Sequence, residues 1–258
     1  MSPLTHSPAP GAAPMSRMVA SHAVMETRLL LRNGEQVLLA VVIPVLVLLG
    51  GAEAGNVIDL GSGRRIDVLT PGVMALAVMS TAFTSLAIAT AFERRYGVLK
   101  LLGASPLPRT GLLLGKVGSL LAVEACQLAL IALVGIALGW RPAGGLGGTL
   151  GAGLLLLLGT AAFAGLGLLM AGTLRAEATL AAANLVYVVL LAAGAVVLPV
   201  SAYPKAMEVV LAVLPSGALA QGLRDVTSGA GLDRTAVVVL TVWAVAAAAL
   251  TARTFRWD

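Results

Sequence analysis

Long stretches without charge constrain this chain more than any other feature of its sequence. Only 11% of its 258 residues are charged, while 59% are hydrophobic. A soluble domain usually has about a quarter of its residues charged, which covers its surface with hydrated groups. A chain so poor in charge cannot cover a soluble surface of this size. We therefore expect an all-α protein that crosses a membrane several times.

The apolar runs predict six transmembrane helices, because about 20 apolar residues in a helix cross a bilayer. The expected spans cover about residues 36–53, 71–92, 112–140, 149–174, 178–199 and 235–253. We expect Pro71 to occupy the first turn of the second span, where its missing N–H costs no helical hydrogen bond. The Pro-, Ser- and Ala-rich residues 1–15 are expected to be a disordered tail, and residues 16–258 to form one transmembrane domain.

Two further segments are helical in pattern but are not expected to cross. In residues 16–34 the basic side chains fall on one helical stripe, while Leu30 and Leu31 face away from it; the stripe holds Arg17, Ser21, Arg28 and Arg32. This pattern predicts a helix lying at the membrane surface, with a solvated helix on a partner protein as the alternative. Residues 200–233 predict two short helices separated by Pro215, forming an interfacial or re-entrant hairpin.

The distribution of Lys and Arg predicts the orientation of the chain. With six spans, eleven of the 17 basic residues fall on the side of both termini, and the other six fall opposite. The richer side holds Arg17, Arg28, Arg32, Arg94, Arg95, Lys100, Arg109, Lys116, Arg175, Arg253 and Arg256. Because cytoplasmic loops carry the excess of Lys and Arg, we expect both termini in the cytoplasm and the 200–233 hairpin outside.

A few polar residues lie inside the apolar runs and are candidates for a transport pathway. Glu124 is an acid deep in the third span, and Ser80 and Thr84 are hydroxyls in the middle of the second. A carboxylate at this depth is costly and is by default a functional hypothesis. The alternative is a structural role, with Glu124 bonded to Gln127 or to a hydroxyl of the second span, and with the hydroxyls serving helix packing.

The polar island at residues 92–109 is the most distinctive part of the loops. Charged residues end the second span at Glu93, Arg94 and Arg95, and Gly97 permits a bend there. Residues 98–102 have the pattern of a short helix, and a turn containing Pro106 follows. We expect a short helix parallel to the membrane, of a shape that docks into a cleft on a soluble partner. The alternative is a loop that has no partner and is basic only because cytoplasmic loops of membrane proteins carry an excess of Lys and Arg.

This island resembles the loop after the second span in ABC-2 type transporter permeases. It shows an acidic-basic pair (Glu93-Arg94), a glycine (Gly97), a Leu-rich turn (Leu99 to Leu102), a Ser-Pro pair (Ser105-Pro106) and a following basic residue (Arg109). A second resemblance covers the external segment before the last span, in Pro199 to Pro204 and in Leu223-Arg224-Asp225-Val226. The number of spans and the N-terminal amphipathic helix also agree with that family.

The resemblance implies the membrane subunit of an ATP-driven exporter in a bacterial plasma membrane. Two such subunits, as a homodimer or paralogous heterodimer, would form the pathway, and two copies of a separate ATPase would bind ATP and Mg. A cytoplasmic coupling helix between the second and third spans would contact the ATPase through Glu93, Arg94, Arg95, Gly97, Leu101, Leu102 and Pro106. The helix carrying Arg17, Arg28 and Arg32 would brace the ATPase at the membrane surface.

No catalytic or metal-binding pattern is apparent in the sequence, so we do not expect an enzyme. Residues 111–117 approach a phosphate loop, but they are one residue short between the glycines and Val117 replaces the required Ser or Thr. The single cysteine, Cys126, excludes an intrachain disulfide. In a membrane chain the net charge of +5 reflects topology rather than a nucleic-acid partner. The alternatives are a proton-coupled secondary transporter using Glu124, and a non-transporting anchor or regulator of an ATPase.

Overall fold

The computed structural model describes residues 13–32, 34, 41–53, 64–98 and 108–255. All regular structure in these residues is helical. In chain order the elements are α1 (Met15–Arg32), α3 (Ile43–Glu53), α4 (Arg65–Val78), η3 (Met79–Ser85), α5 (Leu86–Arg95), α7 (Arg109–Ala137), α8 (Gly145–Thr173), α9 (Ala176–Ala193), η4 (Val200–Ala202), α10 (Lys205–Val213), α11 (Pro215–Ser228) and α12 (Arg234–Thr254).

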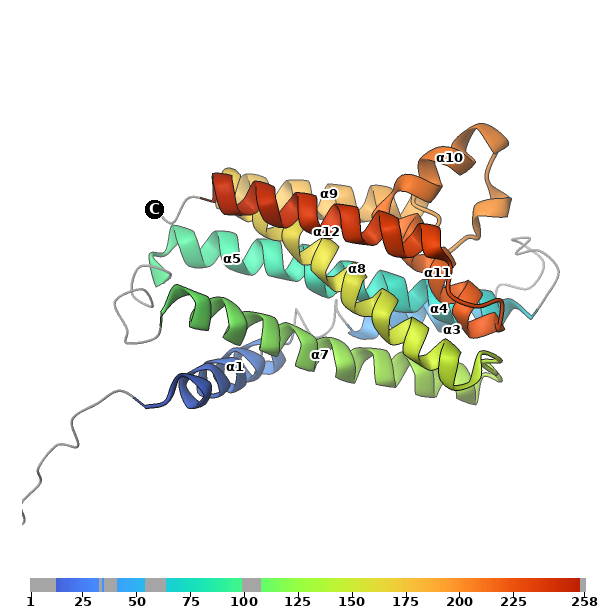
Figure 1. Ribbon diagram of the computed structural model, residues 1–258, viewed down its shortest axis with the longest axis horizontal. Coiled ribbons are helices and arrows are strands. Elements are labelled where there is room, and N and C mark those ends of the chain that lie inside the picture. Colours follow the sequence, from blue (N-terminus) through green and yellow to red (C-terminus); the bar gives the residue numbers. More distant parts are fainter. Residues whose placement is uncertain (1–12, 33, 35–40, 54–63, 99–107, 256–258) are drawn as a thin grey trace, which may run out of the picture.

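The long helices lie side by side in one elongated bundle (Figure 1). We call the end where α5 and α12 finish the α5 end, and the end where α10 and α11 lie the α11 end. Among the described residues, five helices are long and apolar enough to cross a membrane, and they correspond to the second to sixth expected spans. The bent pair of α10 and α11 makes a sixth crossing if it counts as one span. The expected all-α, multi-pass architecture is confirmed.

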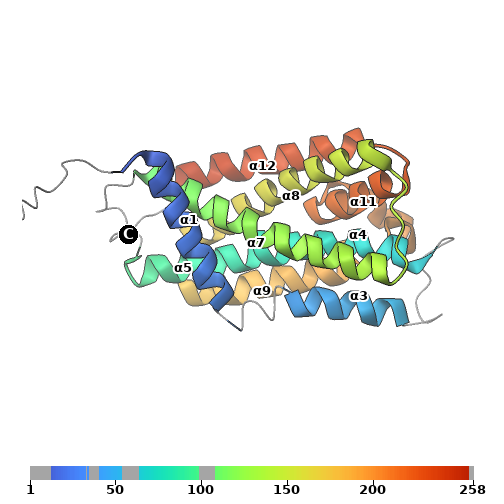
Figure 2. The ribbon, with the colours of Figure 1, turned by 90° about the horizontal axis from the view of Figure 1, so that it is seen from below.

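The first expected span, residues 36–53, lies partly outside the described residues. Its described helix, α3, covers Ile43–Glu53 and is apolar but shorter than a bilayer crossing. α3 packs on α4 (Figure 2), where Gly51 lies close to Leu69. A complete first span therefore stays a prediction.

The second span is one continuous helix from Arg65 to Arg95, built from α4, η3 and α5. It begins before the apolar run, so Pro71 lies inside α4, and the prediction that Pro71 occupies the first turn is wrong. Hydrophobicity marks the part of a helix that lipid or protein surrounds, whereas the helix itself continues into the polar residues beyond. The middle of the span, η3, has π-helical hydrogen bonding, which in proteins often marks a functional bend.

Helix α8 lies at the centre of the bundle and packs on α12, α11 and the second span. Small residues permit these close approaches. A Cβ on Gly165 would lie 2.8 Å from the Cβ of Ala247, and one on Gly167 would lie 2.8 Å from the carbonyl oxygen of Phe83. Phe83 and the fully buried Phe163 pack edge to face, with ring centroids 6.4 Å apart. Close backbone contact of this kind stabilises helices in lipid, where burial of apolar surface gives little.

The chain between α9 and α11 is not a simple continuation of the fifth span. α9 ends at Ala193, and residues 194–199 are non-helical, although the apolar run predicted a span to residue 199. Arg224 of α11 donates hydrogen bonds to the carbonyls of Ala195, Val196 and Val197 in this segment. The guanidinium thus replaces the N–H donors that a helix would have supplied, and polar backbone away from water requires such donors.

Two short helices lie at the α11 end, as the sequence predicted. α10 and α11 meet at Pro215 with a bend of 94°. Pro215 occupies the first turn of α11, where the missing N–H has no helical partner to lose. Whether this hairpin lies outside the cell depends on an orientation that stays a prediction.

Candidate functional site

A cluster of charged side chains joins three helices at the α5 end. Lys116 of α7 places its Nζ 2.8 Å from Oε1 of Glu93 in α5 and 3.4 Å from Oε2 of Glu26 in α1. His22 of α1 places its Nε2 3.7 Å from Oε1 of Glu26. We call these four residues the Lys116 cluster. The side chains of Lys116 and Glu26 are each 12% exposed and that of Glu93 is 20% exposed, so removal of one charge leaves its partners poorly compensated.

The two arginines that end α5 have different partners. Arg94 donates hydrogen bonds to the carbonyl oxygens of Gly172, at 2.7 Å, and of Leu174 at the end of α8. The last carbonyls of a helix lack intrahelical donors, so Arg94 caps α8. Arg95 instead forms an ion pair with Glu177 in the first turn of α9, and both side chains are about half exposed. Arg94 is therefore fixed within the fold, whereas Arg95 belongs to an accessible surface.

An exposed aromatic side chain follows the arginines. Tyr96 is 69% exposed, its ring stacks on Phe92, and the Arg95 guanidinium lies 5.8 Å from the ring centroid. Gly97 adopts a φ of 72°, and its N–H donates to the carbonyl of Arg94. The left-handed conformation, which favours glycine, ends α5 and turns the chain at this point. We call Arg95, Tyr96 and Glu177 the α5 platform.

The remainder of the predicted coupling segment lies outside the described residues. Leu101, Leu102 and Pro106 belong to this part of the chain, so the short helix expected over residues 98–102 stays a prediction. The chain is described again from Pro108, and α7 begins at Arg109. The described residues on either side bring both ends of the segment to the α5 end of the bundle (Figure 1).

Helix α1 crosses α7 obliquely at the α5 end (Figure 2). A Cβ on Gly115 would lie 2.4 Å from Cδ2 of His22, so glycine permits this close contact. The three arginines predicted at the membrane surface are exposed, together with apolar neighbours on the same outward side; this face holds Arg17, Arg28, Arg32, Val24, Met25 and Leu29. Leu31, which was expected to face away from the arginines, is 57% exposed.

Glu124 lies in a polar layer at the middle of the bundle and is 2% exposed. Both its carboxylate oxygens lie within 2.9 Å of the Thr160 hydroxyl in α8, which also lies 2.7 Å from the carbonyl of Leu156. The hydroxyl carries one hydrogen and donates to one of these acceptors at a time. Gln127, one turn further along α7, accepts from Thr81 of η3 at 2.7 Å. This layer therefore ties α7 to α8 and to the second span.

The other two candidate pathway residues, Ser80 and Thr84, lie on η3. Ser80 is 7% exposed and interacts with Tyr187 of α9. The Thr84 hydroxyl is buried and has no hydrogen-bond partner within the described part of the chain. η3 thus presents Thr81 toward α7 and Ser80 toward α9. Two of the three predicted pathway residues, Glu124 and Ser80, are therefore held by contacts with different helices of the polar layer.

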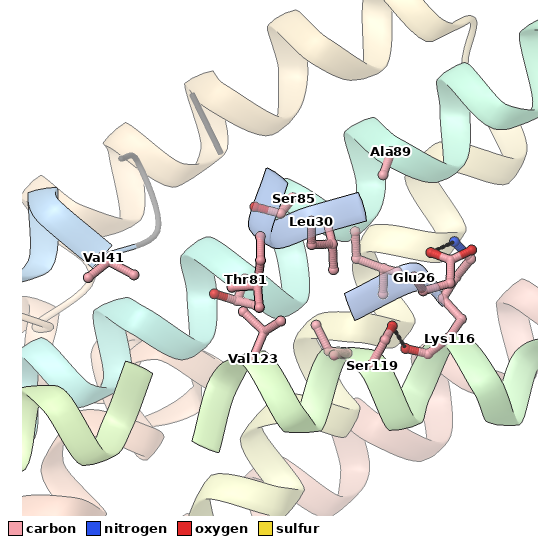
Figure 3. Close-up of a pocket in the computed structure, with 12 residues that line it drawn as sticks. Glu26, Leu30, Val41, Thr81, Ser85, Ala89, Lys116, Ser119 and Val123 are labelled. Carbon is pink, nitrogen blue, oxygen red and sulfur yellow. Dashed lines mark hydrogen bonds and ion pairs between the residues drawn. The ribbon is translucent and has the colours of Figure 1, made fainter. Parts of the chain in front are cut away.

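A small cavity of about 60 Å³ lies between α1, α7 and the second span (Figure 3). Its walls are mainly apolar and include Leu30, Leu86 and Val123. Glu26 and Lys116 of the Lys116 cluster border it toward the α5 end. A cavity of this size accommodates only a few water-sized groups. The helices around it are therefore incompletely packed between the polar layer and the Lys116 cluster.

Sequence reasoning missed Lys116, Glu26 and Thr160. In the sequence, Lys116 stands out only as part of a defective phosphate loop. Glu26 is the single acid of α1 and lies on the side of the helix away from its arginines. An acid on the inward side of a helix indicates that a basic residue of another helix faces it, and this signal could have identified Lys116. Nothing in the sequence indicates that Thr160, rather than a hydroxyl of the second span, meets Glu124. The described residues contain no group of three or more His, Cys, Asp or Glu side chains placed to hold a metal ion.

Comparison with known families identifies a relationship over most of the bundle. A family model described as ABC-2 family transporter protein matches residues 64–253 of the chain. The match begins just before α4 and extends almost to the end of α12, so it includes the α5 platform and the α10–α11 hairpin. α1 and α3 precede the matched region. No curated protein matches the chain significantly.

Proposed function

The chain belongs to the ABC-2 family of transporter membrane proteins, and on that premise we propose that it is the permease subunit of an ATP-driven exporter. The permease domain of this family lacks ATPase activity itself. In our proposal a separate ATPase, in two copies, binds ATP and Mg. Two permease copies, as a homodimer or paralogous heterodimer, form the pathway in a bacterial plasma membrane. The excess of Lys and Arg supports a cytoplasmic α5 end.

The observation that supports coupling is the construction of the α5 platform. Arg95 and Tyr96 are exposed at the point where the chain leaves α5 for the proposed coupling segment. Arg94 directly behind them is bonded to the end of α8. A force applied to the exposed residues is therefore transmitted to α5 and α8 together. Aromatic and arginine side chains are also the residues that most often dominate protein interfaces.

Co-purification tests this proposal directly. The tagged chain is co-expressed with a candidate ABC ATPase subunit from the same source, and the amount of recovered ATPase and its hydrolysis rate are measured. We expect the double variant Arg95→Glu with Tyr96→Asp to reduce recovery by roughly tenfold or more. Arg94 stays unchanged, because its loss would disturb the end of α8. The control is Arg141→Glu, an exposed arginine at the α11 end, and undiminished recovery with the double variant would refute the assigned docking surface.

We also propose that Glu124, Ser80 and Thr84 contribute to the pathway as polar groups within the membrane. For Glu124, the observation is a carboxylate held in mid-bundle by the neutral hydroxyl of Thr160. The competing proposal, proton-coupled transport through Glu124, makes a different prediction about energy. Export that stops on ATP depletion and survives an uncoupler supports the ATP-driven permease, whereas the reverse pattern supports proton coupling.

A further inference from the structure

Near the α5 end the described helices form two packed groups. In the first group α1 lies on α7, with His22 against Gly115 and Ala23 near Gly118. In the second group α5 packs on α8 and α9. Hydrogen bonds from Arg94 to the end of α8 hold this second group, and the exposed Arg95–Glu177 ion pair adds little to it. Each group is therefore internally secured by its own contacts.

The boundary between the two groups is loosely packed. The 60 Å³ cavity lies on this boundary, and its lining includes Leu30 and Val123 from the first group and Ala89 from the second. Figure 3 shows the ends of the cavity-lining side chains facing this space. Lys116–Glu93 is the only ion pair that joins the groups among the residues that the structure describes.

The two groups are joined firmly at the polar layer. Gln127 of α7 is bonded to Thr81 of η3, and Glu124 of α7 is close to Thr160 of α8. At 1.5 Å of rise per residue, Lys116 lies about 12 Å from Glu124 along the helix axis. η3 lies at this level and supplies a π-helical segment, which often marks a bend. The two groups are therefore held together at mid-bundle by the polar layer. Toward the α5 end the cavity separates them, and the Lys116–Glu93 ion pair connects them across it.

The charges of the Lys116 cluster allow the Lys116–Glu93 ion pair to break without leaving Lys116 unpaired. Lys116 lies between two carboxylates, one on α1 and one on α5. When Glu93 withdraws, Lys116 keeps Glu26 as a partner, so no buried cation is left alone. Glu93 is the most exposed of the three charged side chains, at 20% against 12% for Lys116 and Glu26. A simple two-residue pair would leave both charges uncompensated on opening.

We propose that Lys116 is a positioning residue for energy coupling, and that its ion pair with Glu93 is a latch between α5 and the α1–α7 group. Release of the latch lets the α1–α7 group move away from α5, α8 and α9 about the polar layer and opens the cavity toward the α5 end. Closure holds the α5 platform at a fixed distance from α1. The proposal rests on the proposed function, because coupling requires an ATPase at the α5 end, but the latch itself is a property of this chain alone.

The first test uses the chain alone in lipid nanodiscs. In a Cys126→Ala background, Ala89→Cys places one thiol at the cavity, and its rate of reaction with N-ethylmaleimide measures opening. We expect Glu93→Gln to raise this rate by roughly tenfold. Glu93→Gln breaks the latch while the Lys116–Glu26 pair remains, so the fold is preserved. Lys116→Arg, which keeps the cation, and Asp67→Asn, which removes an ion pair at the α11 end, are expected to react at the unmodified rate.

The second test adds the cognate ATPase and a non-hydrolysable ATP analogue. We expect the analogue to accelerate labelling of Ala89→Cys, and Glu93→Gln to label rapidly with or without it. A Glu93→Gln chain that labels slowly, or that labels rapidly yet keeps the full nucleotide response, overturns the latch. Failure of the ATPase to bind the unmodified chain would instead overturn the proposed function, while the first test still decides whether the latch exists.

Discussion

Replacement of Arg224 by methionine should strongly destabilise the α11 end, because its guanidinium serves several backbone carbonyls at once. Arg224 donates to the carbonyls of Val68 and Ala195 at 3.2 and 3.0 Å, and to those of Val196 and Val197. The bonds to Ala195 and Val196 are fully buried. A buried polar group left without a partner costs about 1–3 kcal/mol, so two of them cost about 2–6 kcal/mol. Relief from burying the guanidinium offsets part of this, leaving a net loss of about 3 kcal/mol.

The measurement is the free energy of unfolding in mixed detergent, followed by tryptophan fluorescence. Arg224→Lys should lie between Arg224→Met and the unmodified chain, because an ammonium cannot reach all of these carbonyls as the planar guanidinium does. Arg234→Met, at an exposed arginine in the first turn of α12, is the matched control and should change little. If Arg224→Met unfolds within about 0.5 kcal/mol of the unmodified chain, these carbonyls do not depend on Arg224 and the reasoning is wrong.

Three further changes test the packing of the bundle, with the free energy of unfolding as the common measurement. Gly167→Ala places a Cβ 2.8 Å from the carbonyl oxygen of Phe83 and should cost about 1–3 kcal/mol, whereas Gly153→Ala, which meets nothing within 4 Å, should cost nothing. Phe163→Ala removes a fully buried ring and should cost about 3–5 kcal/mol; a smaller loss would mean that the neighbours collapse into the space. Asp233→Ala removes the side chain that accepts from two N–H groups at the start of α12 and should cost about 1 kcal/mol, with faster hydrogen exchange confined to that turn.

The apolar runs predicted most of the spans because a bilayer sets the length of a helix directly. α7, α8 and α12 each lie within a few residues of the expected ranges. The prediction for the fifth span was less accurate, because residues 194–199 are as apolar as the helix before them. Hydrophobicity reports where lipid or protein surrounds the chain, and it does not distinguish helix from a segment whose carbonyls a distant arginine satisfies.

The candidate site was predictable in its position but not in its contacts. Glu93, Arg94 and Arg95 were identified together as a contact surface because they are adjacent in the sequence. Successive residues of a helix point about 100° apart, so adjacent side chains meet different neighbours. Glu93 turns to Lys116 and Arg94 to the end of α8. Helical periodicity predicts which residues share a face, whereas which helix lies opposite depends on packing between segments far apart in the chain.

The hydrogen bonds of Arg224 also have a consequence for the order in which the protein is made. Synthesis runs from the N-terminus, so residues 195–197 are made before Arg224 exists. The carbonyls of residues 195–197, which are not in a helix, then lack the donor that they have in the finished protein, and polar backbone without donors is excluded from the lipid interior. The end of the fifth span must therefore wait near the lipid–water boundary until α11 arrives, which makes docking of the C-terminal third a late step of membrane insertion.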